Sequence, residues 1–111
     1  MVRMRLLNAK TLKLEEFYGT IPEYAILSHQ WELEEVTYQD VKDGRMTMLR
    51  GWSKILPCCQ IALSRNLSYV WVDTCCIDKS SSAELTESIN SMYHWYEQAE
   101  ECYAFLSDLR L

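Results

Sequence analysis

The stretch Tyr69-Val70-Trp71-Val72-Asp73 decides the fold of this 111-residue sequence. Its β-branched and aromatic residues favour an extended strand, and the run contains no polar residue before its end, which indicates a strand buried on both faces. Similar apolar runs at residues 24–28 and 102–106 predict two more buried strands. Strands of this kind are typical of a parallel sheet covered by helices.

Two helical patterns separate the three predicted strands. Apolar residues recur at spacings of three and four over about residues 52–65 and again over residues 82–99. Pro57 lies inside the first pattern, so that helix either begins near residue 56 or is kinked at the proline. The order strand, helix, strand, helix, strand predicts an α/β domain with a parallel sheet and helices on both faces.

The remaining segments predict smaller elements. Residues 5–8 and 11–17 are interpreted as short strands or an edge hairpin, and residues 36–41 as a short helix. A chain of this length supports one domain, so we expect residues 1–111 to form a single folding unit.

Charge and composition exclude several classes of function. The net charge is −5 and the basic residues are scattered, so nucleic acid is not an expected partner. The sequence has neither an apolar run long enough to span a membrane nor the apolar core of a signal peptide, so we expect a cytoplasmic protein.

The cysteines predict structural thiols in a reducing compartment and no metal site. They form two adjacent pairs and a single residue without a Cys-x-x-Cys motif, and the chain has only two histidines. We expect each adjacent pair to contribute one buried and one less buried side chain. The cysteines are Cys58, Cys59, Cys75, Cys76 and Cys102.

Polar residues follow each predicted strand of the parallel sheet. Ligands bind beyond the carboxyl ends of such strands, where these residues would converge. The sequence therefore predicts one cleft with an imidazole, an indole, several carboxylates and a thiol. The three segments are residues 28–31, 73–79 and 107–108.

Three blocks of the sequence resemble the signature blocks of the fungal heterokaryon-incompatibility (HET) domain. They are residues 24–31, 69–79 and 88–96, in the order and at the spacing typical of that family. The resemblance extends from about residue 4 to residue 108. The chain departs from the family pattern at Gln30 and Glu32, where threonine and often glycine are usual, and at Pro57.

The resemblance implies a fold and a role. HET domains are remotely similar to TIR signalling domains, which have a flavodoxin-like α/β fold, self-associate, and in several lineages cleave NAD. We therefore expect a flavodoxin-like effector domain of self/non-self recognition and programmed cell death, a form of fungal innate immunity. Its expected partners are its own copies and a sensor protein, and NAD is a possible substrate, with no cofactor. Because most family members continue beyond the last block, the chain is expected to be truncated at its C-terminal end, as an excised domain or a short regulator.

Glu84 is the catalytic candidate that the TIR resemblance implies, with Glu87 as the alternate. A carboxylate at the start of the second helix could stabilise the cationic ribose formed when the bond to nicotinamide breaks. We expect ligand contacts from residues near the strand ends, with Trp31 stacking on a ring. These residues are Ser28, His29, Trp31, Asp73 and Asp78.

Structural roles are the alternatives for the same residues. Glu84 stands three residues after Ser81, where a capping-box glutamate belongs. His29 and Trp31 are also candidates for hydrogen-bonded or packed residues of the fold. Asp73 and Asp78 are candidates for residues that cap the turn before the helix. A different chemical role is considered for Cys75, that of a nucleophile. The corresponding alternatives for the whole domain are a non-enzymatic interaction scaffold and a nucleotide-binding regulatory module.

Overall fold

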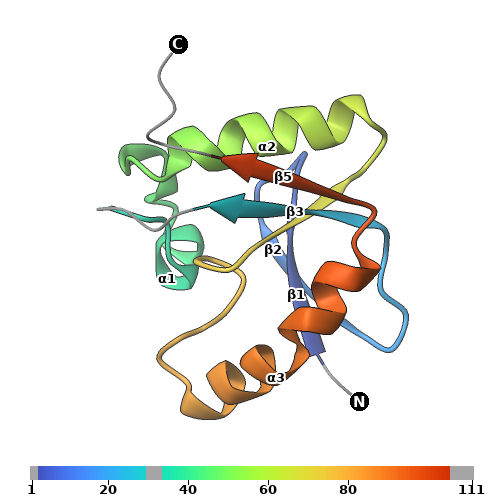
Figure 1. The fold of residues 1–111 in the computed structure, drawn as a ribbon. Helices are drawn as coiled ribbons and strands as arrows, with labels where there is room; N and C mark the ends of the chain where they lie inside the picture. The colour runs from blue at the N-terminus through green and yellow to red at the C-terminus, as the bar shows by residue number, and fades with distance from the viewer. Residues whose placement is uncertain (1–2, 30–33, 106–111) are drawn as a thin grey trace.

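The computed structural model describes residues 3–29 and 34–105. Their helices and strands alternate along the second half of the chain, as Figure 1 shows. The strands are β1 (Arg3–Asn8), β2 (Leu14–Tyr18), β3 (Tyr24–His29), β4 (Tyr69–Val72) and β5 (Glu101–Phe105). The helices are α1 (Tyr38–Lys42), the 3-10 turn η1 (Met46–Met48), α2 (Trp52–Ser64) and α3 (Ser82–Gln98).

The three predicted parallel strands are neighbours in one sheet. Its strand order is β2-β1-β4-β3-β5, and β3 pairs in parallel with both β4 and β5. Ile26, near the middle of β3, lies opposite Trp71 on one side and Cys102 on the other. The prediction for residues 24–28, 69–73 and 102–106 is therefore confirmed in pairing and direction, except that residue 106 lies outside the described residues.

The predicted parallel sheet is confirmed only for β3, β4 and β5, because β1 and β2 run antiparallel to their neighbours and make the whole sheet mixed. β1 pairs antiparallel with β2 and also with β4. Only residues 9–13 connect β1 to β2, and a connection this short reverses the chain direction, whereas parallel neighbours need a long crossover. The predicted edge hairpin is confirmed, and it extends the parallel strands on the β4 side.

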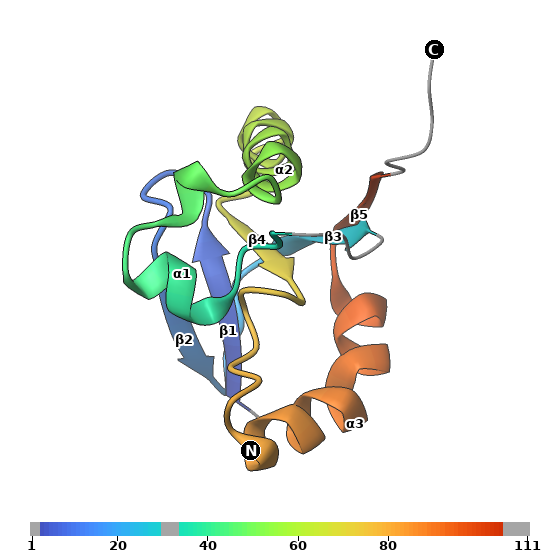
Figure 2. The ribbon, with the colours of Figure 1, turned by 90° about the vertical axis from the view of Figure 1, so that its left-hand side faces the viewer.

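Helices α2 and α3 lie on opposite sides of the strands β4, β3 and β5 (Figures 1 and 2). From β3 the chain crosses through α2 to β4, and it then returns through α3 past β3 to β5. Right-handed crossovers in opposite directions place their helices on opposite faces. Helices on both faces are thus confirmed, while the flavodoxin-like relationship stays a prediction.

The helix boundaries decide between the two interpretations of Pro57. α2 begins at Trp52, so Pro57 lies within the helix rather than in its first turn. The proline removes one backbone hydrogen bond from α2, and the helix is nevertheless anchored by Ile55, Cys59 and Ala62, which are buried against the sheet. No described helix has the length and apolar character needed to cross a membrane.

The core is centred on Trp71 and includes both cysteine pairs. The Trp71 ring is fully buried and packs against Trp95 of α3, with ring centroids 5.6 Å apart. Both members of each cysteine pair are buried, so the expectation of one less buried thiol per pair is wrong. Cys58 and Cys59 are both buried because the apolar stripe of α2 is wide enough to include adjacent positions. Cys75 and Cys76 are both buried because residues 74–77 form a loop whose four side chains all face the interior.

Candidate functional site

His29 and Asp73 meet at the carboxyl ends of β3 and β4. His29 is the last residue of β3, and Asp73 follows the last residue of β4. Because the two strands are parallel neighbours, their ends lie at the same edge of the sheet, and His29 Nε2 comes within 3.0 Å of Asp73 Oδ1. This is the contact that the predicted cleft required between the first and second strands.

The second nitrogen of His29 contacts a lysine that the sequence analysis did not select. Lys54 Nζ of α2 lies 3.1 Å from His29 Nδ1, and the same ammonium group bonds to Glu35. An ammonium group can only donate, so Nδ1 accepts and the ring proton on Nε2 is donated to Asp73. Asp73, His29, Lys54 and Glu35 form a continuous chain of contacts, which we call the histidine network.

The histidine network is shielded from water. The side chains of His29, Lys54 and Glu35 are 2%, 5% and 9% exposed, whereas that of Asp73 is 26% exposed. Both ring nitrogens of His29 have partners, so this arrangement fixes the ring and favours the structural role considered for it. Lys54 stands directly before Ile55 in the apolar pattern of α2, and a charged residue on that buried stripe was the signal available in the sequence.

Glu84 belongs to a second network, between β1 and the start of α3. Its carboxylate bonds to Arg3 and to Arg5, with 2.5 Å between Arg5 Nη1 and Glu84 Oε2. It also accepts a hydrogen bond of 2.7 Å from the backbone N–H of Asp78. Together with Glu16, which is 2.8 Å from Arg5, these side chains form what we call the arginine network.

Only half of the predicted capping box at the start of α3 is formed. The hydroxyl of Ser81 accepts a hydrogen bond from the backbone N–H of Glu84, as the pattern requires. The carboxylate of Glu84 is directed to Arg3, Arg5 and Asp78 instead of returning to Ser81. The helix is therefore capped by Ser81, while Glu84 links the helix to the first strand.

The arginine network holds its carboxylates in the ionised form. Burial alone would raise the pKa of Glu84, but the hydrogen bonds from Arg5 and the Asp78 amide and the charges of Arg5 and Arg3 outweigh it, so the pKa is lowered. The hydrogen bond from Arg5 also lowers the pKa of Glu16. Glu84 is accordingly a carboxylate, not a proton donor, in the folded protein.

The other predicted site residues lie near these two networks. Ser28 lies near Tyr96 of α3: burial raises the pKa of the Tyr96 hydroxyl, and the Ser28 side chain opposes that rise. Asp78 accepts hydrogen bonds from the backbone N–H and the hydroxyl of Ser80, a local turn that lowers the pKa of Asp78 and agrees with its predicted capping role. Trp31 lies outside the described residues. His29 and Asp73 are thus brought into contact, whereas Glu84 is held by different partners; ligand contacts of these residues stay a prediction.

The structure gives Cys75 no activated thiolate. The hydrogen bond with Cys76 and the complete burial of the side chain raise the pKa of Cys75 well above its ordinary value. A nucleophilic cysteine needs the opposite shift. Within residues 3–29 and 34–105, no three His, Cys, Asp or Glu side chains are grouped so that they could hold a metal ion.

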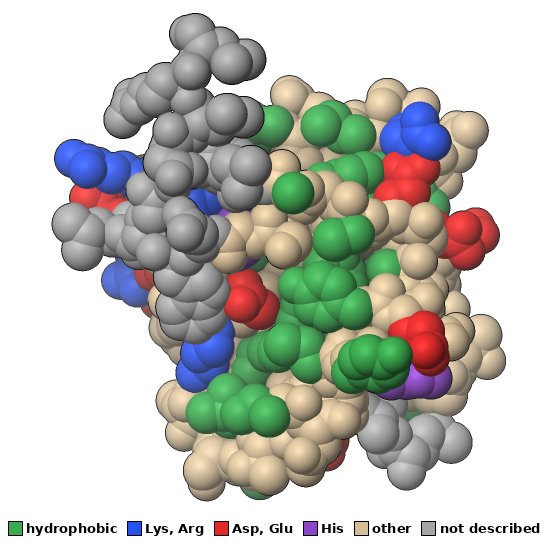
Figure 3. Space-filling view, viewed as in Figure 1, with side chains coloured by type: hydrophobic (Ala, Val, Ile, Leu, Met, Phe, Trp, Pro, Cys, Tyr) green, Lys and Arg blue, Asp and Glu red, His purple; other side chains and the backbone are tan. Residues whose placement is uncertain are grey.

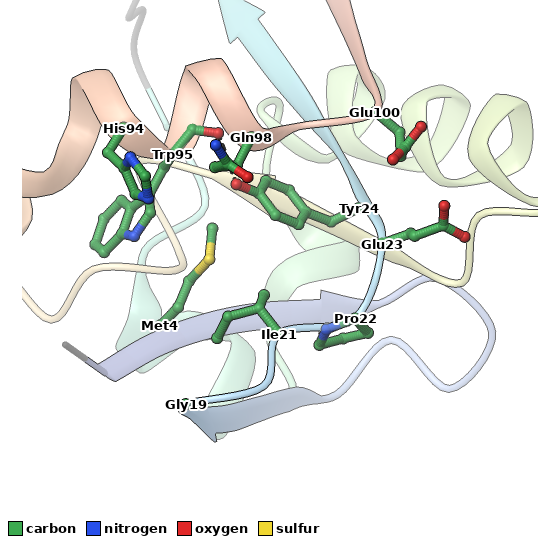
Figure 4. A pocket seen from close by; sticks show the side chains of 10 residues that line it. All are labelled: Met4, Gly19, Ile21, Pro22, Glu23, Tyr24, His94, Trp95, Gln98 and Glu100. Atoms are coloured by element: carbon green, nitrogen blue, oxygen red, sulfur yellow. Dashed lines mark hydrogen bonds between the residues drawn. The ribbon is translucent and has the colours of Figure 1, made fainter. Parts of the chain in front are cut away.

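Glu84 lines a shallow pocket of about 310 Å³ with Arg3 and Glu87. A larger pocket of about 550 Å³ lies at the opposite end of the parallel strands, beside Tyr24 at the start of β3 (Figure 4). The hydroxyl of Tyr24 donates a hydrogen bond to the backbone oxygen of Trp95, and Met4 lies on the floor of this pocket. This second pocket is separate from the carboxyl edge where the sequence predicted the site.

Sequence comparisons identify the protein family to which this α/β domain belongs. The family model described as "Heterokaryon incompatibility protein (HET)" matches residues 24–110, so the chain belongs to the HET family. The chain is 53% identical over 93 residues to "Vegetative incompatibility protein HET-E-1" of Podospora anserina, an alignment that covers 82% of this chain and 7% of that relative. The chain therefore spans only a small part of the length of that relative. No solved structure matches the chain.

Proposed function

We propose that this chain is an effector domain of the fungal incompatibility response and that self-association brings it into action. Membership of the HET family supports the role in incompatibility. The observation that carries the proposed self-association is a row of large apolar side chains on the solvent side of α3. Ile89, Tyr93 and Tyr96 in this row, which we call the α3 row, are 62%, 80% and 39% exposed.

The α3 row follows one side of the helix. Positions separated by four and three residues are neighbours on a helix surface, so the three side chains form one stripe. Figure 3 shows hydrophobic side chains gathered over the part of this face where α3 lies in Figure 1. Tyr96 is anchored by its edge contact with Trp71, with 6.1 Å between ring centroids. A second copy that covers the row would remove this apolar surface from water.

The size of the α3 row favours a weak contact that needs a high local concentration. Full burial of a large apolar side chain stabilises by roughly 1.5–3 kcal/mol, and association first has to offset the loss of translational and rotational freedom. Burial of three partly exposed side chains does not supply enough favourable free energy for a tight dimer at low concentration. Tethering to a sensor or partner protein raises the effective concentration, and the much greater length of the incompatibility relative is in keeping with such a tether.

Sedimentation equilibrium over a wide concentration range tests the self-association. We expect the wild-type chain to form dimers or larger species as its concentration rises. Ile89→Ser and Tyr93→Ser should weaken the association with little effect on folding, because both side chains are mostly exposed. Tyr18→Ser is the matched control, because Tyr18 is 60% exposed on β2 and lies outside the α3 row. Unchanged association of the α3 variants, or a wild-type chain that stays monomeric at every concentration, would contradict the proposal.

Expression in a fungal host connects the contact with the biological effect. The wild-type chain, fused to an inducible dimerisation module, is expected to cause cell death when the inducer is added. The same fusion with Tyr93→Ser should retain its abundance and kill less efficiently. Equal killing by both fusions would show that the α3 row is not needed for signalling.

A second candidate function is cleavage of NAD at Glu84. It is favoured by the pocket of about 310 Å³ in which an ionised carboxylate lies beside the guanidinium of Arg3. In this reaction water adds to the ribose carbon as the bond to nicotinamide breaks, which gives nicotinamide, ADP-ribose and one proton. Glu84 would stabilise the cationic sugar, and Arg3 would neutralise phosphate charge. This role requires the carboxylate to exchange an arginine contact for the substrate.

Nicotinamide release by concentrated protein distinguishes the two candidates. If Glu84 is catalytic, wild type should release nicotinamide from NAD, and Glu84→Gln should not, at a temperature where both are shown to be folded. Glu87→Gln is the matched control in the same pocket and tests the alternate carboxylate. No release from samples shown to contain oligomers would exclude cleavage under these conditions and favour the scaffold.

A further inference from the structure

The strand β5 forms one edge of the sheet, and none of the described strands pairs with its outer side. An edge strand exposes backbone N–H and C=O groups that can pair with another chain, and proteins commonly protect such edges with charges, proline or bulges. The opposite edge strand, β2, carries the adjacent carboxylates Glu15 and Glu16. β5 contains no proline, and its one charged residue, Glu101, is paired with Arg65 at the end of α2. Of the two edges, β5 is therefore less protected against pairing.

Alternate residues of β5 direct their backbone groups to the outer side. The N–H of Glu100, directly before the strand, donates a hydrogen bond of 2.9 Å to the backbone oxygen of Tyr24 in β3. Successive backbone groups of a strand point in opposite directions within the sheet, so those of Cys102 also face β3. The N–H and C=O groups of Glu101 and Tyr103 consequently face outward.

The side chain of Cys102 lies on the face of the sheet that α3 covers. Cys102 is opposite Ile26 of β3, and Ile26 is opposite Trp71 of β4. Paired residues of neighbouring strands have their side chains on the same face, and Trp71 packs against Trp95 and Tyr96 of α3. Because Cys102 is exposed, the outer edge of β5 remains accessible on the face that carries α3.

The edge of β5 and the α3 row lie on one side of the molecule. Figure 2 places β5 at one end of the sheet, on the side where α3 lies. Figure 3, which has the view of Figure 1, shows hydrophobic side chains gathered over the region where β5 and α3 lie in Figure 1. A single partner can therefore cover both features at once.

We propose that a second copy of this chain pairs with β5 in the antiparallel direction, so that the two sheets join across a two-fold axis. The proposal rests on the self-association proposed above and specifies its geometry. The axis passes between Tyr103 and Tyr103 of the second copy, whose outward N–H and C=O groups form a hydrogen-bonded pair. Because this axis is perpendicular to the sheet, both α3 rows lie on the same face of the joined sheet.

A second copy fits this edge better than an unrelated strand. Burial of the α3 row alone is too small for a tight dimer, and pairing of β5 adds main-chain hydrogen bonds, which supply affinity when a strand joins a sheet edge. In the antiparallel register Glu101 lies opposite residue 105 of the other copy, so no two charges of β5 meet. The contact is isologous and closes at two copies, whereas pairing of β5 with the acidic edge β2 would continue without limit.

Hydrogen exchange of single amides, measured by NMR on the whole chain at low and high concentration, tests the pairing. The N–H groups of Glu101 and Tyr103 should exchange at least about tenfold more slowly at high concentration, because the second copy hydrogen-bonds them. The N–H groups of Cys102 and Ala104 face β3 and are the internal controls, whose exchange should change little with concentration.

Cross-linking of Cys102 tests the two-fold arrangement. The two copies of this residue are diagonal neighbours across the antiparallel pair, at a separation of about 7–8 Å. A short bismaleimide should therefore join two chains through Cys102 at concentrations where the chain associates, and mass spectrometry should identify the linked residue. Cys102→Ser should give no cross-linked dimer, because the other four cysteines are buried.

Two variants of β5 test the contact without a change in the α3 row. Tyr103→Pro removes the outward N–H at the axis, and Ala104→Lys places a charge at an exposed position of the seam. Each should raise the dissociation constant of the dimer by about tenfold, while circular dichroism shows that the fold is retained. If proline prevents folding, Ala104→Lys decides the test. Thr47→Lys, at an exposed position of η1, is the control for the added charge and should associate like wild type.

The pairing of β5 is wrong if the chain associates while the Glu101 and Tyr103 amides stay unprotected, or if folded β5 variants associate as tightly as wild type. In either case, a loss of association in the α3 variants would still support the self-association proposed above. A chain that stays monomeric at every concentration would contradict both proposals. Species that grow beyond dimers would assign the contact to pairing of β5 with β2 and overturn the two-fold arrangement.

Discussion

Glu84 and Arg5 form a shielded ion pair between elements that are 79 residues apart in the chain. Their side chains are 10% and 4% exposed, and the carboxylate joins the first strand to the first turn of α3. Removing one partner of a shielded pair leaves the other charge buried, which costs more than the loss of an exposed pair. The residue implied as catalytic therefore also has a measurable role in stability.

Glu84→Gln should lower the free energy of unfolding by about 1–3 kcal/mol, because a neutral amide replaces the carboxylate that Arg5 contacts. The retained contact between Arg5 and Glu16 limits the loss. The sequence pattern alone predicts little change, since glutamine can complete a capping box. Urea denaturation followed by circular dichroism measures the difference, and Glu87→Gln at an exposed position is the control. Equal midpoints for Glu84→Gln and wild type would show that the pair does not stabilise the fold.

Acidification should destabilise the protein through the same carboxylates. The pKa values of Glu84 and Glu16 are lowered in the folded state, so the unfolded state binds protons more readily. The contribution of these two carboxylates to the free energy of unfolding is complete above their pKa in the unfolded state, about 4.3. It is lost as the pH falls through their lower pKa values in the folded state. Urea midpoints at decreasing pH should fall, and the fall should be smaller in Glu84→Gln. The same pH dependence in both proteins would assign the acid sensitivity to other groups.

Lys54→Met should destabilise the protein by about 3 kcal/mol, because it removes the ammonium group between His29 and Glu35 in a shielded site. Methionine has a similar length and fits the apolar stripe of α2. The double variant with Glu35→Gln should be more stable than the sum of the two single changes predicts, since it removes both charges. Additive effects in a double-mutant cycle by urea denaturation would show that the two residues do not interact.

Cys102 should be the first cysteine to react with a thiol reagent in the native protein. It is exposed on β5, whereas the other four cysteines are buried, and burial raises the pKa of Cys58 and of Cys59 to about 12. Thiol labelling followed by mass spectrometry should give one modified site in native buffer and five in denaturant. Rapid native labelling of the four buried residues would contradict the described core.

The central part of the fold could be predicted because short-range patterns determine it. The apolar runs at residues 24–28 and 69–73 have no polar face, and the period of residues 82–99 is helical, so strand and helix follow from local burial. The pairing of β1 with β4 could not be predicted in the same way. The short connection to β2 predicts the antiparallel hairpin, but the side chains of β1 suit either direction beside β4, and the antiparallel pairing with β4 exists only in the folded sheet.

The sequence by itself determined the family, the order of the elements and the edge at which His29 and Asp73 meet, because signature residues and the strand period are properties of neighbouring positions. Only the tertiary structure decided what each polar group contacts. Lys54 reaches His29 from another helix, and Glu84 reaches Arg5 across the domain. A local pattern such as the capping box predicts that the Glu84 side chain bonds back to Ser81. Two opposite charges brought together away from water interact more strongly than that local hydrogen bond. For that reason the role of Glu84 depends on packing that no single segment of the sequence contains.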